Sequence, residues 1–258
     1  MHVPDTPRPR LGAANTDAPE FRITFGDLGL IVLGIAAGIL AAAAGGHLSA
    51  RWIDPQHSMR QVFGGQTIVL AGLSLQAMIT VGAVWIFGIR RRGMDWSAVG
   101  FRRASLGWIV VATLAAVACM PLVAGVTQAF QALLDRPVSS PQAEVLAPAA
   151  DSWIGVIGLI LLGGLAAPFA EELLFRGVLY PLLRRVWGVS VGAVVSAAVF
   201  SVVHGFVDVI PGTFLLGVIL ALLYERTGSL WVPLTLHAVF NSANFILMFV
   251  ALTASIEP

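Results

Sequence analysis

Long apolar stretches that carry almost no charge restrict what this sequence can fold into. Seven of them are candidates to cross a bilayer core of about 30 Å, although the fifth and sixth are short. Only 11% of the 258 residues are charged, against about 25% in soluble proteins. The sequence therefore predicts an all-α protein, a polytopic transmembrane helical bundle of about seven spans, or eight if the last stretch is divided. The windows lie at about 28–49, 62–89, 107–130, 152–183, 189–206, 210–224 and 231–254.

The chain divides into a short polar tail and one membrane domain. Residues 1–27 are predicted to form a disordered N-terminal tail, because most of them are polar and show no helical or strand periodicity. Residues 28–258 form the transmembrane domain. With the N-terminus inside, the connecting segments place eleven arginines inside and three outside, which predicts a cytoplasmic N-terminus.

The charge balance and the cysteine count exclude several classes of partner and site. Fifteen basic residues against 14 acidic ones give no reason to expect a nucleic-acid partner. The single cysteine excludes a disulfide framework and a cysteine-based metal cluster. The expected surroundings of this chain are the lipid bilayer.

A few ionisable residues lie inside the apolar windows of the second half of the chain. A charge at the bilayer centre costs about 3 kcal/mol, so such residues face the bundle interior and usually mark function. Any chemistry is therefore expected between residues 165 and 245. The residues are Glu171, Glu172, Arg176, His204 and His237, together with the polar Asn241.

Helical spacing separates supporting residues from candidates for chemistry. Glu172 and Arg176 are four positions apart and share a helix face, which predicts an internal, structural ion pair. Glu171 is rotated by about 100° from Glu172 and is left available for chemistry. His237 and Asn241 are also four positions apart, so their side chains can point to one place.

Three short motifs contain these residues. They are EELLFR at Glu171–Arg176, FSVVH at Phe200–His204 and HAVFN at His237–Asn241. In this order, each on an apolar helix, they resemble the CPBP family of intramembrane proteases. That family includes the type II CAAX prenyl endopeptidases and bacterial relatives linked to bacteriocin processing or immunity. The resemblance covers a protease-like core at about 150–245, with no departure at the motif positions.

The resemblance implies hydrolysis of a peptide bond within a membrane, here expected to be that of a bacterial cell. Glu171 would be the general base and would share the activation of water with His204. His237 and Asn241 would stabilise the oxyanion, a task that needs fixed donors. Glu172 and Arg176 would hold in place the helix that carries Glu171.

A metal remains open from the residues alone. Glu171, His204 and His237 form a plausible zinc ligand set that leaves a position for water. Their spacing lacks the H-E-x-x-H signature of helical zinc proteases. We favour a metal-free glutamate mechanism, with no cofactor assigned and zinc as the alternative, although the family is often classed as metalloproteases.

Two other functions compete with an endopeptidase. A catalytically silent membrane scaffold or immunity protein would bind a partner through its membrane face, but it has no reason to bury all these polar residues. A small proton-coupled carrier would also use buried Glu and His, but no inverted repeat supports it. The expected substrate is a membrane-embedded or lipidated protein or peptide, and the sequence does not say whether it is prenylated.

Overall fold

The computed structural model describes residues 20–138 and 140–254, and all regular structure in these residues is helical. The predicted all-α class is confirmed. Three of the elements, η1, η4 and η5, are π-helical, and η2, η3 and η6 are 3₁₀-helical. The elements are α1 (Phe25–Ile53), α2 (Met59–Phe63), α3 (Gly65–Ala83), η1 (Val84–Arg90), η2 (Trp96–Val99), α4 (Leu106–Leu133), α5 (Pro141–Leu146), η3 (Ala147–Ala149), α6 (Trp153–Leu159), η4 (Ile160–Ala166), α7 (Ala167–Leu174), η5 (Phe175–Leu179), α8 (Tyr180–Val203), η6 (Val207–Val209), α9 (Ile210–Thr227) and α10 (Trp231–Ala254).

Six helices in the described residues are long and apolar enough to cross a membrane. They identify a multi-pass integral membrane protein. The seven predicted windows fall on these six segments, because the fourth and fifth windows lie in one continuous segment, Trp153–Val203, in which two helices meet at a kink at Gly188. The last window is a single unbroken helix, α10, and is not divided into two segments. The six are Phe25–Ile53, Gly65–Arg90, Leu106–Leu133, Trp153–Val203, Val207–Thr227 and Trp231–Ala254.

The long fourth helix folds back on itself at Gly188. Gly188 has φ 75° and ψ −179°, a conformation that residues with a Cβ avoid and glycine adopts readily. Phe175 precedes the bend and Phe200 follows it, yet their ring centroids are 5.0 Å apart. A straight helix would separate these residues by roughly 37 Å. The bend therefore brings the first two motifs side by side.

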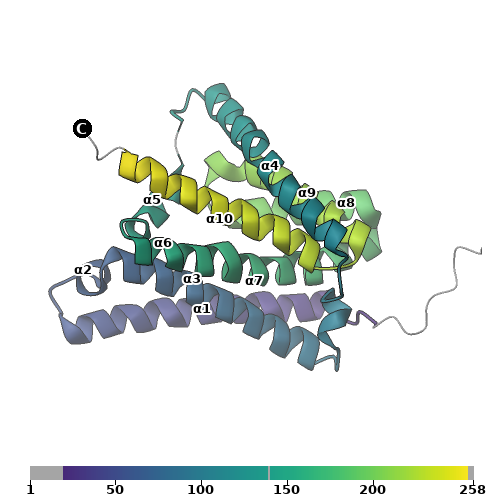
Figure 1. The fold of residues 1–258 in the computed structure, drawn as a ribbon. Helices are drawn as coiled ribbons and strands as arrows, with labels where there is room; N and C mark the ends of the chain where they lie inside the picture. The colour runs from purple at the N-terminus through teal and green to yellow at the C-terminus, as the bar shows by residue number, and fades with distance from the viewer. Residues whose placement is uncertain (1–19, 139, 255–258) are drawn as a thin grey trace, which may run out of the picture.

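The helices are layered around α6 and α7. Figure 1 shows α6 and α7 running between the pair α1 and α3 on one side and α10 on the other. The contacts agree with this view, since α7 packs on α3 and α10, and α8 packs along α9. The helix that carries Glu171 and Glu172 is thus the central one of the bundle.

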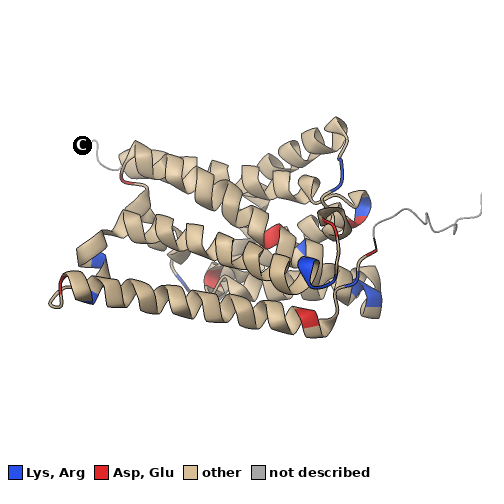
Figure 2. Ribbon diagram, turned by 90° about the horizontal axis from the view of Figure 1, so that it is seen from below, with Lys and Arg blue, Asp and Glu red and all other residues tan. Residues whose placement is uncertain are grey.

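One end of the bundle is rich in arginine, as Figure 2 shows near the start of α1. There the buried Asp27 carboxylate lies 2.7 Å from a terminal nitrogen of Arg92 and 3.4 Å from Nε of Arg91. Thr24 caps α1 through a reciprocal capping box with Asp27. Both arginines share one carboxylate that lies almost wholly out of contact with solvent.

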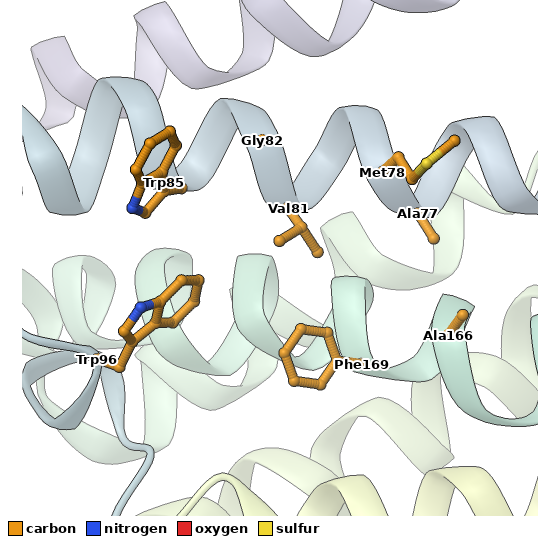
Figure 3. A pocket seen from close by; sticks show the side chains of 8 residues that line it. All are labelled: Ala77, Met78, Val81, Gly82, Trp85, Trp96, Ala166 and Phe169. Carbon is orange, nitrogen blue, oxygen red and sulfur yellow. The ribbon is translucent and has the colours of Figure 1, made fainter.

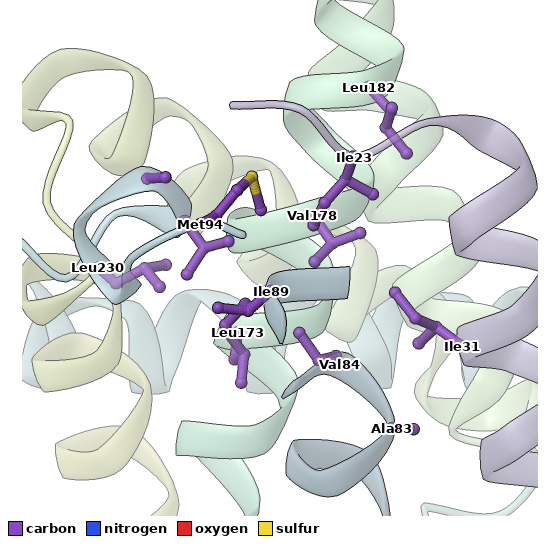
Figure 4. Packing of buried hydrophobic residues seen from close by; sticks show 12 residues of the cluster. Ile23, Ile31, Ala83, Val84, Ile89, Met94, Leu173, Val178, Leu182 and Leu230 are labelled. Carbon is purple, nitrogen blue, oxygen red and sulfur yellow. The ribbon is translucent and has the colours of Figure 1, made fainter. Parts of the chain in front are cut away.

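Of the predicted tail, residues 1–27, the first 19 lie outside the described residues. Beyond that point the chain is already packed, because Ile23 is fully buried and α1 begins at Phe25. The side chain of Ile23 belongs to an apolar cluster that also contains Val84, Leu173 and Leu230 (Figure 4). Since Leu173 belongs to α7, this cluster fixes the arginine-rich end of the central helix.

Candidate active site

The first motif lies on a short α-helix between two π-helical stretches. η4 ends just before Pro168, and η5 begins at Phe175, within the motif itself. Pro168 has no N–H to donate to the helix, and the N–H of Ala167 donates to the carbonyl of Leu162, five residues back. π-Helical turns of this kind occur frequently at functional sites. Here they set the rotation at which α7 presents its two glutamates.

Glu172 and Arg176 form the ion pair that the sequence predicts. Nη1 of Arg176 donates to Oε1 of Glu172 at 2.8 Å, and their side chains are 0% and 1% exposed. Nη2 of Arg176 donates to the carbonyl of Gly217 at 3.0 Å. The guanidinium carbon lies 4.6 Å from the centroid of the Phe200 ring. Arg176 therefore joins α7 and η5 to α8 and α9 through polar and cation–π contacts.

His237 connects α10 to both glutamates of α7. Its Nδ1 lies 2.8 Å from Oε1 of Glu172, and its Nε2 lies 3.7 Å from Oε2 of Glu171. Because Glu172 is ion-paired with Arg176, it is a carboxylate and accepts a hydrogen bond, so Nδ1 of His237 is the donor. Nε2 then faces Glu171. The sequence predicts the Glu–Arg pair but not this second task of Glu172, which the adjacent E-E spacing permits.

Glu171 is the partly exposed residue of the site. Its side chain is 20% exposed, whereas Glu172 and His237 are at most 2% exposed. Oε2 of Glu171 is itself buried and has no hydrogen-bond partner. The 3.7 Å separation from Nε2 of His237 is longer than a hydrogen bond. A carboxylate with free acceptor capacity thus stands beside an imidazole whose other nitrogen is fixed.

His204 ends the second arm of the folded helix and is oriented by the backbone. Its Nδ1 lies 2.7 Å from the carbonyl of Phe200, while its own backbone N–H turns to Ser201 and Val202. The Phe200 carbonyl accepts from the imidazole, which places the proton on Nδ1 and leaves Nε2 as the acceptor of the neutral ring. In the described part of the chain no hydrogen bond or ion pair joins His204 to Glu171. The ring of Phe200 packs against both histidines. Its centroid is 4.7 Å from the ring centroid of His204 and 5.8 Å from that of His237.

Asn241 lies one turn after His237 and hydrogen-bonds to a backbone carbonyl of η4 that has no partner within its own helix. Its Nδ2 donates to the carbonyl of Gly163 at 3.2 Å. π-Helical hydrogen bonds join a carbonyl to the N–H five residues later, which for Gly163 is residue 168, a proline without an N–H. The N–H of Ala167, the α-helical partner of Gly163, donates to the carbonyl of Leu162 instead. One of the two amide hydrogens of Asn241 is therefore committed to anchoring α10 on η4. Gly163 and Pro168 carry no chemistry, and nothing in the motif spacing points to their contact with Asn241.

The three candidate ligands of the zinc alternative are not placed together as a ligand set in the described residues. Among residues 20–138 and 140–254, no three His, Cys, Asp or Glu side chains are placed to hold one metal ion. The engaged nitrogen of each imidazole is Nδ1, which leaves Nε2 as the atom that could coordinate a metal, so the misfit lies in how the three side chains are placed and not in these hydrogen bonds. The donors present thus do not fit a site made of Glu171, His204 and His237, and the chemistry below uses the side chains alone.

Comparison with known proteins points to the same part of the chain. Residues 153–243 match the family model described as Rce1-like, type II CAAX prenyl endopeptidase. The chain is 26% identical over 84 residues to a Bacillus subtilis (strain 168) protein named "Putative membrane peptidase YdiL". This match covers 33% of the present chain and 34% of that relative, about a third of each. No solved structure matches the chain significantly. The matched segment contains all three motifs and every side chain of the site, so this part of the chain is similar to the Rce1-like family where the site lies.

Proposed function

We propose that this protein is an intramembrane endopeptidase that cleaves a membrane-embedded or lipidated protein or peptide. The observation that carries the proposal is the arrangement of Glu171. Its partly exposed carboxylate stands beside an imidazole, and that imidazole is fixed by the buried Glu172–Arg176 pair. A scaffold gains nothing from placing Glu171 beside a second glutamate and a histidine in an apolar bundle, since ionisable groups in such surroundings cost stability.

The side chains support hydrolysis by activated water. Glu171 takes one proton from water as the oxygen of that water attacks the carbonyl carbon, and Nε2 of His204 helps to orient the water by accepting a hydrogen bond from its other hydrogen. The same proton passes from Glu171 to the leaving amine as the carbon–nitrogen bond breaks. With Nδ1–H given to Glu172, His237 donates from Nε2 to the oxyanion as an imidazolium. The remaining amide hydrogen of Asn241 is the second donor.

The placement of these groups supports a membrane-embedded or lipidated substrate. Glu171 and His237 lie on helices long and apolar enough to cross a membrane, and His204 directly follows the end of another, so the scissile bond is expected to reach them within the bilayer. A peptide meets this requirement if it is itself apolar or carries a lipid. The arginine-rich end of the bundle faces the cytoplasm in our proposal, by the rule that cytoplasmic segments are enriched in Arg and Lys.

The test of this function is a catalogue of peptide termini in membranes that contain either the native protein or Glu171→Gln. Termini that occur only with the native protein are the expected result, since glutamine preserves the shape of the side chain and removes the base. Mass spectrometry of the two membrane preparations provides the measurement and names the substrate at the same time.

The control for this comparison is Glu144→Gln, which changes the same residue type at an exposed position in α5. Its catalogue is expected to equal that of the native protein. Identical catalogues for native protein and Glu171→Gln, in the native host and with equal amounts of folded protein, would contradict the proposal and favour a scaffold.

A second prediction concerns Pro168. Its replacement by alanine restores a backbone N–H and allows η4 to return to α-helical pairing, in which the N–H of Ala167 occupies the carbonyl of Gly163. Asn241 then loses its anchor. We expect kcat to fall about fivefold to tenfold, the equivalent of one hydrogen bond, with KM unchanged. Steady-state kinetics with the purified protein measure both constants.

A double variant separates this anchoring role from a general loss of structure. If Pro168 acts through Asn241, then Pro168→Ala has no further effect on kcat once Asn241 is alanine. If the kcat of the double variant falls by the product of the two single losses, Pro168 and Asn241 act independently. Pro121→Ala, in the interior of α4, is the matched proline control and is expected to leave kcat unchanged.

A further inference from the structure

A second concave feature lies on the other side of α7 from the polar site. It is a groove with a volume of about 520 Å³ between α3 and its continuation η1 on one side and η4 and α7 on the other (Figure 3). None of the glutamates, histidines or amides of the active site lines it. Its volume is in the range of small-molecule sites, which are mostly apolar. The lining residues are Ala77, Met78, Val81, Gly82, Trp85, Trp96, Ala166 and Phe169.

The inner wall of the groove is fixed by aromatic packing. The ring of Phe169 stacks on Phe101 with centroids 5.2 Å apart, and Trp96 meets Phe101 edge-on at 5.6 Å. Phe101 in turn contacts Trp231 at 5.5 Å. Aromatic pairs in these geometries are stabilising beyond the area that they bury. The groove is therefore formed by the fold itself and does not depend on a ligand to shape it.

The two ends of the groove differ in chemistry. Figure 3 shows Trp85 and Trp96 at one end and Ala77, Met78 and Ala166 at the other, where no polar side chain lines the groove. From Ala77 to Trp85 the helix advances about 12 Å. Tryptophan is typical of membrane interfaces because its ring is apolar and its N–H is polar. The groove thus runs from an interfacial end into the hydrocarbon region.

A positive charge without a carboxylate stands at the tryptophan end. The guanidinium of Arg90 lies 5.5 Å from the ring centroid of Trp85. In the described residues it forms no ion pair, whereas its neighbours Arg91 and Arg92 are both paired with Asp27. The one available charge of the three thus lies beside the polar end of an apolar groove.

We propose that this groove binds one acyl chain of an anionic phospholipid, with the lipid phosphate held by Arg90. The apolar length accepts a hydrocarbon chain, and the indole N–H groups of Trp85 and Trp96 are donors at the level of the ester carbonyls. The uncompensated arginine selects for a negatively charged headgroup. Since Phe169 is two residues before Glu171, the bound lipid braces the catalytic helix against α3 from its rear face.

Gly82 offers a direct test, because a Cβ at this position meets nothing within 4 Å. The Cβ of Gly82→Leu therefore enters free space, and the rest of the side chain occupies the groove. Gly72, also in α3, is equally unhindered but does not line the groove, so Gly72→Leu is the matched control. The measurement is native mass spectrometry of the purified full chain titrated with dioleoyl phosphatidylglycerol or dioleoyl phosphatidylcholine. We expect native protein and Gly72→Leu to retain one phosphatidylglycerol, and Gly82→Leu to lose it.

Arg90→Gln tests the headgroup half of the proposal. One basic residue near a charged lipid surface is equivalent to about a fivefold change in binding. We expect Arg90→Gln to weaken phosphatidylglycerol binding by this factor and phosphatidylcholine binding hardly at all. The exposed Arg103, changed to Gln, is the control. Equal retention of both lipids by the native protein, or undiminished binding by a folded Gly82→Leu, would overturn the proposal. Thermal unfolding of each variant reports whether it is folded.

Discussion

Purified protein with Glu171→Gln is expected to cleave its substrate about 10²–10⁴-fold more slowly than the native protein, the usual contribution of a general acid–base group. Glutamine cannot take the proton of the attacking water. The loss is expected in kcat with KM nearly unchanged, because Glu171 contacts the reacting water and no buried partner depends on it for a hydrogen bond. The measurement is the initial rate on a peptide identified from the terminus catalogue.

Thermal unfolding of the same preparation distinguishes catalysis from folding. Glu171 is the more exposed of the two glutamates, so its replacement is expected to leave the unfolding temperature within a few degrees of the native value. Glu144→Gln supplies the comparison for both rate and stability. A rate loss below tenfold in Glu171→Gln would assign the base to another group, of which His204 is the next candidate.

Arg176→Met is expected to lower the free energy of unfolding by about 3–5 kcal/mol, which is typical when one partner of a buried ion pair is removed. The change leaves Glu172 as a buried carboxylate whose remaining partner is His237. It also leaves the carbonyl of Gly217 without the donor that it has now. Reversible denaturant titration in mixed micelles measures the difference.

A double variant tests the electrostatic cause of this loss. Glu172→Gln in the Arg176→Met background removes the uncompensated charge and keeps an oxygen for His237. It is expected to recover a large part of the lost stability. Arg103→Met, at an exposed position, is expected to stay within about 0.5 kcal/mol of the native protein. If the double variant is less stable than Arg176→Met, then packing of the long side chain, not charge, determines the loss.

Features that depend on local spacing could be predicted from the sequence. The apolar windows follow from composition over a span of residues, and nearly all of their length lies in helices. The Glu172–Arg176 pair follows from the pitch of one helix, and the structure confirms it. Neither prediction depends on how one helix packs against another.

Features that depend on how helices meet could not be predicted in this way. The contact of His237 with Glu172 joins residues 65 positions apart. Asn241 donates to the carbonyl of Gly163, and Arg176 donates to that of Gly217. Both acceptors are glycines, so no side chain in the sequence indicates these contacts. All three contacts depend on how separate helices pack, and that of Asn241 also depends on the π-helical stretch η4, whereas periodicity analysis assumes regular helices. The zinc alternative likewise depends on how the helices meet, since its candidate ligands share a region of sequence but do not converge as ligands in residues 20–138 and 140–254.

The π-helical stretches on either side of α7 also determine how this chain should be aligned with its relatives. A π-turn is equivalent to one extra residue accommodated in a helix. A relative with regular α-helix at η4 would therefore lack one residue there, although its glutamates occupied the same place in space. A gap belongs in that short stretch, between Leu159 and Ala167, and not in the loops where alignments usually put one. An ungapped alignment that keeps the glutamates in register would shift every residue before them by about 100° around the helix.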